Sequence, residues 1–174
     1  MTLKDVLKSE AEHMYEVTKG LFDLVDPDQL DWKPGTGSNW MTTGQLMHHC
    51  ATACGSMFKG FVSGDWDFPA DMEMPADDAG SMLPPADAMP RPVGIDEVLR
   101  LLEEDRRTAM KYVVEVDERD LLTKSFEPPW GGHEATLFQH LLMSIWHLGQ
   151  HKGQLFYYLK LQGKPVDTQS LWGM

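Results

Sequence analysis

The stretch of sequence that decides the fold is residues 136–162, TLFQHLLMSIWHLGQHKGQLFYYLKLQ. Leucine and isoleucine recur in it at intervals of three, four and seven residues, which is the period of a helix with one apolar face. The stretch opens with Thr136 and Gln139, whose spacing is typical of a capping box at a helix N-terminus. Gly163 and Pro165 follow the stretch and favour a stop. The sequence therefore predicts a long helix over 136–162.

Three further stretches, residues 3–25, 42–64 and 94–116, carry the same helical period. No alternation of apolar and polar residues is long enough for a strand, and no internal repeat is present. A chain of 174 residues fits one domain with a core of its own. We therefore predict an all-α fold, a four-helix bundle that forms a single domain over residues 1–174.

The second and third predicted helices are joined by a long connection, residues 65–92. It contains six prolines, seven acidic residues and four methionines, a composition that does not form a core. Because it is longer than the usual connection between helices, we expect either a crossover that spans the bundle or a lid. A plain surface loop is the alternative.

The charge of the chain limits its partners. Its 27 acidic and 15 basic residues give a net charge of −12, which disfavours binding to nucleic acids and to anionic membranes. No apolar run approaches the roughly 20 residues of a membrane span, and the N-terminus lacks a signal peptide, so we expect a cytoplasmic protein. The two cysteines, Cys50 and Cys54, are either small core residues or a redox-sensitive pair near the histidines.

The histidines indicate where chemistry takes place. At about 100° per residue, His140, His147, His151 and Tyr158 fall on one stripe beside the apolar face of the last helix. His147 and His151 are one turn apart, the spacing at which one helix offers two imidazoles to a single metal ion. The same spacing also occurs on solvated helix faces, so the pattern alone leaves both possibilities open.

The second predicted helix supplies a third candidate ligand. His49 borders its apolar stripe, whereas the neighbouring His48 faces solvent. His133 lies in a predicted loop and is interpreted as incidental. His13 follows Glu10 at the spacing found in di-iron bundles, but those need a second Glu-x-x-His motif, which is not present.

Four segments of the chain carry a family resemblance. They are LDWKPG at 30–35, TGQLMHH at 43–49, HLGQHKGQL at 147–155 and GKPV at 163–166. On these segments the sequence resembles the DinB-like superfamily of bacterial four-helix metalloproteins, over roughly residues 3–172. It differs from the family in the long acidic connection and in carrying Lys152 where Arg is commoner in the motif at 147–155.

The resemblance implies a bundle with a crossover connection and one divalent metal ion held by His49, His147 and His151. Members of known activity include thiol-dependent S-transferases and isomerases that use low-molecular-weight bacterial thiols, and many others have no established activity. Three imidazoles leave a metal, Zn or Ni by ligand type, with an open position where a bound thiol or water becomes a nucleophile. We therefore expect a metal-dependent thiol transferase or hydrolase that acts on a small molecule.

Two other functions stay open. One is a non-enzymatic, stress-related module that binds a small molecule or a metal in the same pocket. The other is a bundle whose histidines are structural and hold no metal. A fold of this kind does not decide between them by itself.

A few more residues are predicted to lie around the site. His140 and Tyr158 share the stripe of the candidate ligands, so we expect them in the pocket or hydrogen-bonded to a ligand. The charged residues Glu10, Arg106 and Lys152 fall near the apolar stripes of their helices. They are expected to pair with each other, orient a ligand histidine or bind an anionic substrate; the alternative is that they reach solvent at the bundle ends.

Apolar residues outside the main stripes predict a homodimer. A symmetric dimer commonly buries a leftover apolar face of a small bundle. The alternative is that the long connection and the C-terminal tail cover these residues within one chain. The residues concerned are Leu101, Leu142, Trp146, Phe156, Leu171 and Trp172.

Overall fold

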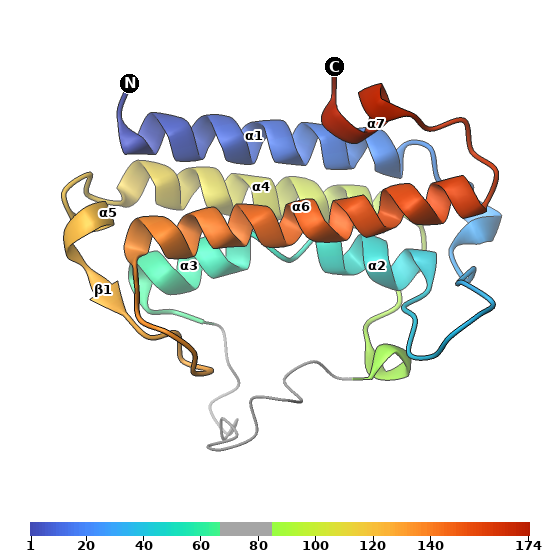
Figure 1. The fold of residues 1–174 in the computed structure, drawn as a ribbon, viewed down its shortest axis with the longest axis horizontal. Helices are drawn as coiled ribbons and strands as arrows, with labels where there is room; N and C mark the ends of the chain where they lie inside the picture. Colours follow the sequence, from blue (N-terminus) through green and yellow to red (C-terminus); the bar gives the residue numbers. More distant parts are fainter. Residues whose placement is uncertain (67–84) are drawn as a thin grey trace.

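The structure is a computed structural model that describes residues 1–66 and 85–174, shown in Figure 1. Its elements, in chain order, are α1 (Leu3–Phe22), a 3-10 turn η1 (Pro27–Gln29), α2 (Thr43–Cys50), α3 (Gly55–Ser63), a second 3-10 turn η2 (Ala86–Ala88), α4 (Ile95–Glu115), α5 (Asp120–Thr123), the strands β1 (Ser125–Phe126) and β2 (Ala135–Thr136), α6 (Leu137–Leu161) and α7 (Thr168–Trp172). The two strands form one small antiparallel pair.

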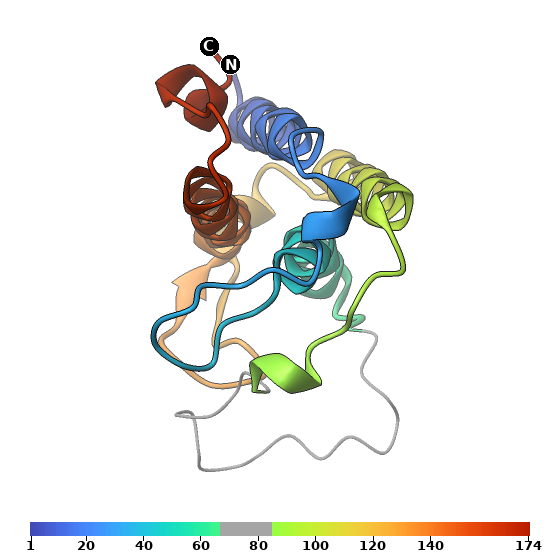
Figure 2. The same cartoon turned by 90° about the vertical axis from the view of Figure 1, so that its right-hand side faces the viewer.

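Four rods of helix make up the bundle: α1, α4, α6 and the pair α2–α3, whose members lie end to end. α4 and α6 each contact both α1 and α3, so the rods form a closed ring of neighbours. Figure 2 looks along the bundle and shows the rods around a common centre. The predicted all-α four-helix bundle is thereby confirmed.

The starts of three rods follow from the sequence. The side chains of Thr2, Thr42 and Thr136 each accept a hydrogen bond from the backbone N–H three residues further on. The side chain of that later residue in turn accepts one from the backbone N–H of the threonine, which completes a capping box. The apolar stripes of the rods then meet in one core. Its largest fully buried members are Tyr15, Phe22, Phe58, Leu7, Leu21, Leu46, Met47, Leu121, Leu141, Ile145, Leu148 and Leu155.

The connection between α3 and α4 is a crossover. The two helices point the same way along the bundle, so α3 ends at one end and α4 begins at the other (Figure 1). Residues 67–84 of the predicted connection, and with them the predicted lid, lie outside the described residues. The described part after them contains η2, where Ala86 and Met89 accept hydrogen bonds from the buried amide of Gln45.

The predicted continuous helix over 42–64 is wrong. The chain leaves the helical path between Cys50 and Gly55, and the result is two helices, α2 and α3. The side chain of Asp105, on α4, accepts hydrogen bonds from the backbone N–H groups at the start of α3. Helical period alone did not indicate this break, because it depends on a residue from another rod.

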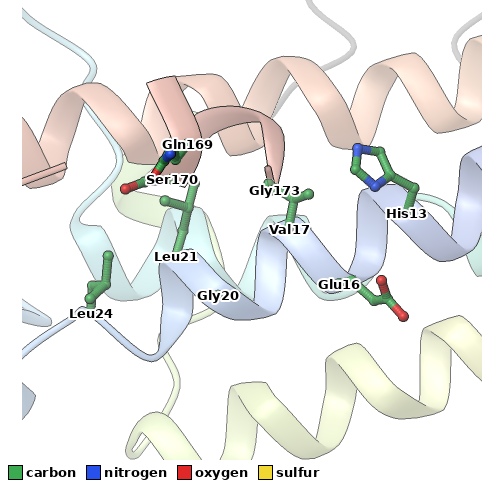
Figure 3. Close-up of a pocket in the computed structure, with 9 residues that line it drawn as sticks. All are labelled: His13, Glu16, Val17, Gly20, Leu21, Leu24, Gln169, Ser170 and Gly173. Atoms are coloured by element: carbon green, nitrogen blue, oxygen red, sulfur yellow. The ribbon is translucent and has the colours of Figure 1, made fainter. Parts of the chain in front are cut away.

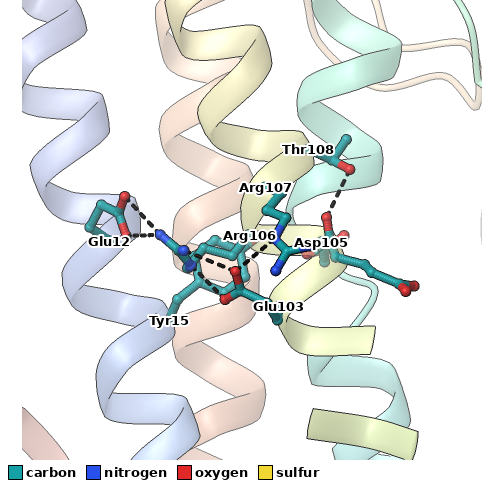
Figure 4. Close-up of polar contacts among 8 residues, drawn as sticks. Glu12, Tyr15, Glu103, Asp105, Arg106, Arg107 and Thr108 are labelled. Carbon is teal, nitrogen blue, oxygen red and sulfur yellow. Dashed lines mark hydrogen bonds and ion pairs between the residues drawn. The ribbon is translucent and has the colours of Figure 1, made fainter. Parts of the chain in front are cut away.

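Hydrogen bonds from charged side chains to the backbone, and one ion pair, tie α4 to α1. Glu118, just after α4, accepts from the backbone N–H groups of Leu3 at 2.7 Å and Lys4 at 3.2 Å, which are at the start of α1. The Lys4 ammonium in turn donates to two carbonyls at the end of α4. Arg106 on α4 pairs with Glu12 on α1 and with Glu103 (Figure 4), so it is neutralised at the half-buried face between the two helices.

The C-terminal tail packs on the bundle through α7, which contacts α1 and α6. Phe156 is buried, whereas Trp146 and Trp172 are 58% and 56% exposed. The tail therefore covers only part of the apolar surface that suggested a dimer. None of the helices within residues 1–66 and 85–174 combines the length and the apolarity that a membrane crossing requires.

Candidate metal centre

Three histidine side chains from two helices meet between α2 and α6. His49 lies in the last turn of α2, and His147 and His151 lie one turn apart on α6. Nε2 of His49 is 3.0 Å from Nε2 of His151 and 3.3 Å from Nε2 of His147. Within the described part of the chain, they form the one group of three or more possible metal ligands. The three histidines chosen from the sequence are thus brought together.

The spacing of these nitrogens fits a single metal ion. A tetrahedral ion with metal–nitrogen bonds of about 2.0–2.1 Å holds neighbouring nitrogens about 3.3 Å apart. The two separations of His49, 3.0 and 3.3 Å, are close to this value, and all three ligand atoms lie within 4.8 Å of one another. Imidazole suits Zn, Ni, Cu and Fe better than it suits Mg or Ca. The cluster could hold one divalent ion and would leave a further coordination position open.

The three rings are held in the form that binds a metal. Burial, followed by the charges of His151 and His147, lowers the pKa of His49 to about 4. Burial also lowers the pKa of His147, and that of His151. Metal binding requires neutral imidazole, so protons do not compete for these nitrogens at neutral pH.

Outer contacts orient two of the rings. Oε1 of Gln154 lies 2.9 Å from Nδ1 of His151, and because an amide oxygen only accepts, Nδ1 donates. The backbone of Ala53, between α2 and α3, is the hydrogen-bonding partner of His147 and raises its pKa against the effect of burial. In both cases Nε2 is left to face the cluster, as is usual for metal-binding histidines. The role of Gln154 follows from its place one turn after His151, a signal that was available in the sequence.

A cavity of about 280 Å³ opens beside His147. Its wall is mostly apolar and aromatic. The lining residues are Met57, Phe61, Pro128, Trp130, His140, Met143, Ser144 and His147. A ligand in this cavity would have an apolar surface on most sides and the histidine cluster at one end.

His140 takes the pocket position that was expected of it. Its ring is buried and stacks against both Phe61 and Phe126, with ring centroids 4.5 and 4.9 Å away. Its Nε2 lies 2.9 Å from the carbonyl oxygen of Phe126 and donates to it. His140 therefore lines the cavity but is not part of the cluster.

Tyr158 lies away from the histidines, contrary to the expectation of a pocket role. Its hydroxyl donates to the carbonyl of Met41 at 3.0 Å, and its ring packs edge-on against Trp32 and Trp40. Tyr158 does lie on the same stripe of α6 as His151, but two helical turns separate the two residues. It holds the segment before α2 against α6.

Glu10 and Lys152 also lie elsewhere. Both line a groove of about 440 Å³ between α1, α6 and α7, together with Trp146 and Trp172. The Lys152 ammonium donates to the carbonyl of Leu171 at 2.6 Å and lies over the Trp172 ring. The expectation that they orient a ligand histidine is wrong, because Lys152 points from α6 towards the tail. Its observed role is to fasten α7.

The other histidines stay apart from the cluster, as expected. His48 is half-buried next to His49, and His133 is exposed after β1. His13 is exposed on α1, at a small cavity under the tail near Gly173 (Figure 3). None of these three belongs to the metal-ligating group.

The two cysteines are core residues. Cys50 and Cys54 are free thiols with no exposed surface. Burial raises the pKa of both thiols far above the usual range. Since the thiolate is the reactive form, the structure favours the core role over the redox-sensitive one.

Comparison with known proteins agrees with the geometry. No curated protein matches the sequence. The sequence pattern of the DinB superfamily matches residues 10–155, which include α2, α3, α4 and the part of α6 that carries His147 and His151. With its four-helix bundle and its histidine cluster, the chain belongs to the DinB superfamily.

Proposed function

We propose that the protein is a metal-dependent enzyme that joins a small-molecule thiol to an electrophile, using one Zn or Ni ion held by His49, His147 and His151. The observation that carries this proposal is the convergence of three neutral Nε2 atoms at single-ion spacing. A metal ion in this position supplies Lewis acidity, which lowers the pKa of a thiol or a water. In the transfer, the sulfur–carbon bond forms as the leaving group departs with its electron pair, and the thiol proton passes to solvent.

The cavity beside His147 supports an electrophile with an apolar or aromatic group. Phe61, Trp130 and Met57 offer such a group a wall of rings and a flexible thioether. Nε2 of His140 and Oγ of Ser144 are already hydrogen-bonded to the Phe126 and His140 carbonyls. Recognition in this cavity would therefore rest on shape and apolar contact, with the reacting atom next to His147.

The reacting thiol has to come from outside the protein. Cys50 and Cys54 are fully buried, and the raised pKa of each keeps it in the thiol form at neutral pH. Neither can attack a substrate, so the proposal requires a soluble thiol as co-substrate. The free state of both cysteines also agrees with the cytoplasmic location that we propose.

The test has two stages. In the first, metal content of the purified protein is measured by elemental analysis, and up to one divalent ion per chain is expected. In the second, the Zn-loaded and Ni-loaded proteins are mixed with a panel of low-molecular-weight thiols and an aromatic electrophile, and the thioether is followed by mass spectrometry. His49→Ala should lose both metal and turnover, whereas His48→Ala, its immediate neighbour, should keep them.

The outcomes separate the competing functions. Hydrolysis of an ester without thiol transfer would point to the hydrolase. Metal uptake with ligand binding but no turnover would support the non-enzymatic module. A protein that takes up no metal at neutral pH would refute the proposal as a whole.

A further inference from the structure

Asp105 is a buried carboxylate that reaches from α4 to the break between α2 and α3. Its Oδ2 accepts from the backbone N–H groups of Gly55 at 2.8 Å and Cys54 at 3.2 Å, and its Oδ1 accepts from that of Ser56 at 3.2 Å. The first N–H groups of a helix have no partner within the helix. Asp105 thus completes the start of α3 from another rod.

Tyr15 adds a fourth hydrogen bond to the same carboxylate. Its hydroxyl, on α1, donates to Oδ2 of Asp105 at 2.6 Å, and both side chains are buried. Burial raises the pKa of Asp105, and the hydrogen bonds from Gly55 and Tyr15 oppose that rise. All four hydrogen-bonding partners of Asp105 among the described residues are donors, which suits an ionised carboxylate, since that group only accepts.

The chain at the break is adapted to this contact. A Cβ atom at Gly55 would overlap the backbone carbonyl of Asp105, so only glycine lets the start of α3 lie this close to α4. The helical period of the sequence, which takes no account of this contact, predicts one continuous helix over 42–64. Asp105 therefore accounts for the break that the helical period does not.

The break decides how two of the three clustered histidines are placed. His49 is in the last turn of α2, five residues before Cys54, so the angle of the break sets where its ring lies. The backbone of Ala53, inside the break, lies close enough to His147 to affect its pKa. In a continuous helix the Ala53 carbonyl would instead accept from the N–H of Met57.

We infer that Asp105 is a positioning residue of the histidine cluster: it holds the α2–α3 break in the shape that brings His49 to His147 and His151. This inference rests on the metal site proposed above and goes beyond it, since Asp105 touches neither a metal nor a substrate. Tyr15 supports it by fixing the Asp105 carboxylate.

The test compares three variants of the full chain. Asp105→Asn keeps the shape of the side chain but removes the charge that accepts three N–H groups. Tyr15→Phe removes only the supporting hydrogen bond. Val98→Ala, the matched control, shortens another fully buried side chain on α4, two helical turns before Asp105.

Two measurements are made on each variant. The first is zinc affinity by competition with a chelator, together with the absorption spectrum of the Co²⁺-loaded protein, which reports ligand geometry. The second is the NMR resonances of the His49 and His147 rings in metal-free protein. Asp105→Asn should weaken zinc binding at least tenfold, change the cobalt spectrum and shift both rings, and Tyr15→Phe should do the same more weakly. Val98→Ala should stay within twofold of the original protein with unchanged spectra.

Each result decides the question. Unchanged affinity and spectra in Asp105→Asn, or an equal loss in Val98→Ala, would overturn the positioning role. If Asp105→Asn does not fold, Tyr15→Phe set against Val98→Ala decides in the same way. If the unaltered protein binds no metal, the proposed function fails, while shifts of the ring resonances still show whether Asp105 places the histidines.

Discussion

Nε2 of His49 lies 3.0 Å from Nε2 of His151, although 102 residues separate the two along the chain. The group that they form with His147 consists of neutral imidazoles only; among the described residues, no carboxylate belongs to it. An ion with three neutral ligands keeps its full double charge. It therefore favours an anion, such as a thiolate or a hydroxide, in its remaining position.

The first prediction concerns which histidines bind the metal. His49→Ala, His147→Ala and His151→Ala should each weaken zinc affinity at least tenfold, because each removes one of three ligands. His48→Ala and His133→Ala should change it less than twofold. Isothermal titration calorimetry at neutral pH measures all five variants, and loss of binding in His48→Ala rather than His49→Ala would show that the site is misassigned.

The second prediction concerns the pH dependence of stability in the metal-free protein. The pKa of His49 falls from its ordinary value of 6.5 to about 4 on folding. At a pH between these two values, the His49 ring is protonated in the unfolded chain and neutral in the folded chain. The free energy of unfolding should therefore fall as the pH drops from 7 to 5, by about 1 kcal/mol from this side chain after allowance for its partial exposure.

Urea denaturation at pH 7 and at pH 5 measures this loss. His49→Gln is the control, because it has no titrating ring at this position and should lose less stability than the original protein. Equal losses in both proteins would mean that the cluster does not resist protonation.

The third prediction concerns the thiols. Cys50 and Cys54 should react with a thiol reagent such as dithionitrobenzoate only as fast as the protein unfolds, because both are buried and their pKa values are raised. In denaturant, two thiols per chain should react at once. Rapid labelling of the folded protein would reopen the possibility of an internal nucleophile.

Local sequence was enough for the starts of three rods and for the choice of His49 over His48, whereas the joining of His49 with His147 and His151 was implied by the family resemblance. The starts of α1, α2 and α6 depend on capping residues within three positions of one another, and the 100° rotation per residue placed His49 and not His48 at a helix contact. These features are set by residues close along the chain, so they could be predicted from it.

Features of the fold that depend on contacts between rods could not be predicted from the local sequence. The break before α3 requires Asp105, 50 residues further on from Gly55. Lys152 can lie inside the apolar stripe of α6 because its ammonium group donates a hydrogen bond to the carbonyl of Leu171, on α7. A helical wheel gives the direction of a side chain but not the group that it meets.

The fourth prediction concerns the close contact at α3. Gly55→Ala should destabilise the protein by about 1–3 kcal/mol, since its Cβ would overlap the backbone of Asp105. Gly20→Ala is the matched control on α1, where a Cβ meets nothing within 4 Å. It should be neutral or stabilise by about 0.5 kcal/mol. Thermal unfolding of both variants measures the difference, and equal effects would contradict the contact.

The fifth prediction is a homodimer at micromolar concentration. Trp146 and Trp172 are more than half exposed and flank the groove that also holds Glu10 and Lys152. Burying this surface against a second copy is favourable. Light scattering over a range of concentrations should give twice the 19.7 kDa of one chain, and Trp146→Glu should lower the mass to that of one chain. A single-chain mass at every concentration would reject the dimer.

The carboxylates of Glu118 and Asp105 have one more consequence, for the way in which the protein opens. The first holds the initial N–H groups of α1, and the second holds those of α3; both are carried on or directly after α4. Neither helix can unwind from its beginning without giving up an acceptor that belongs to α4. We therefore expect amide hydrogen exchange in the first turns of α1 and α3 to be coupled to the release of α4, with the two turns opening together as part of one cooperative unit.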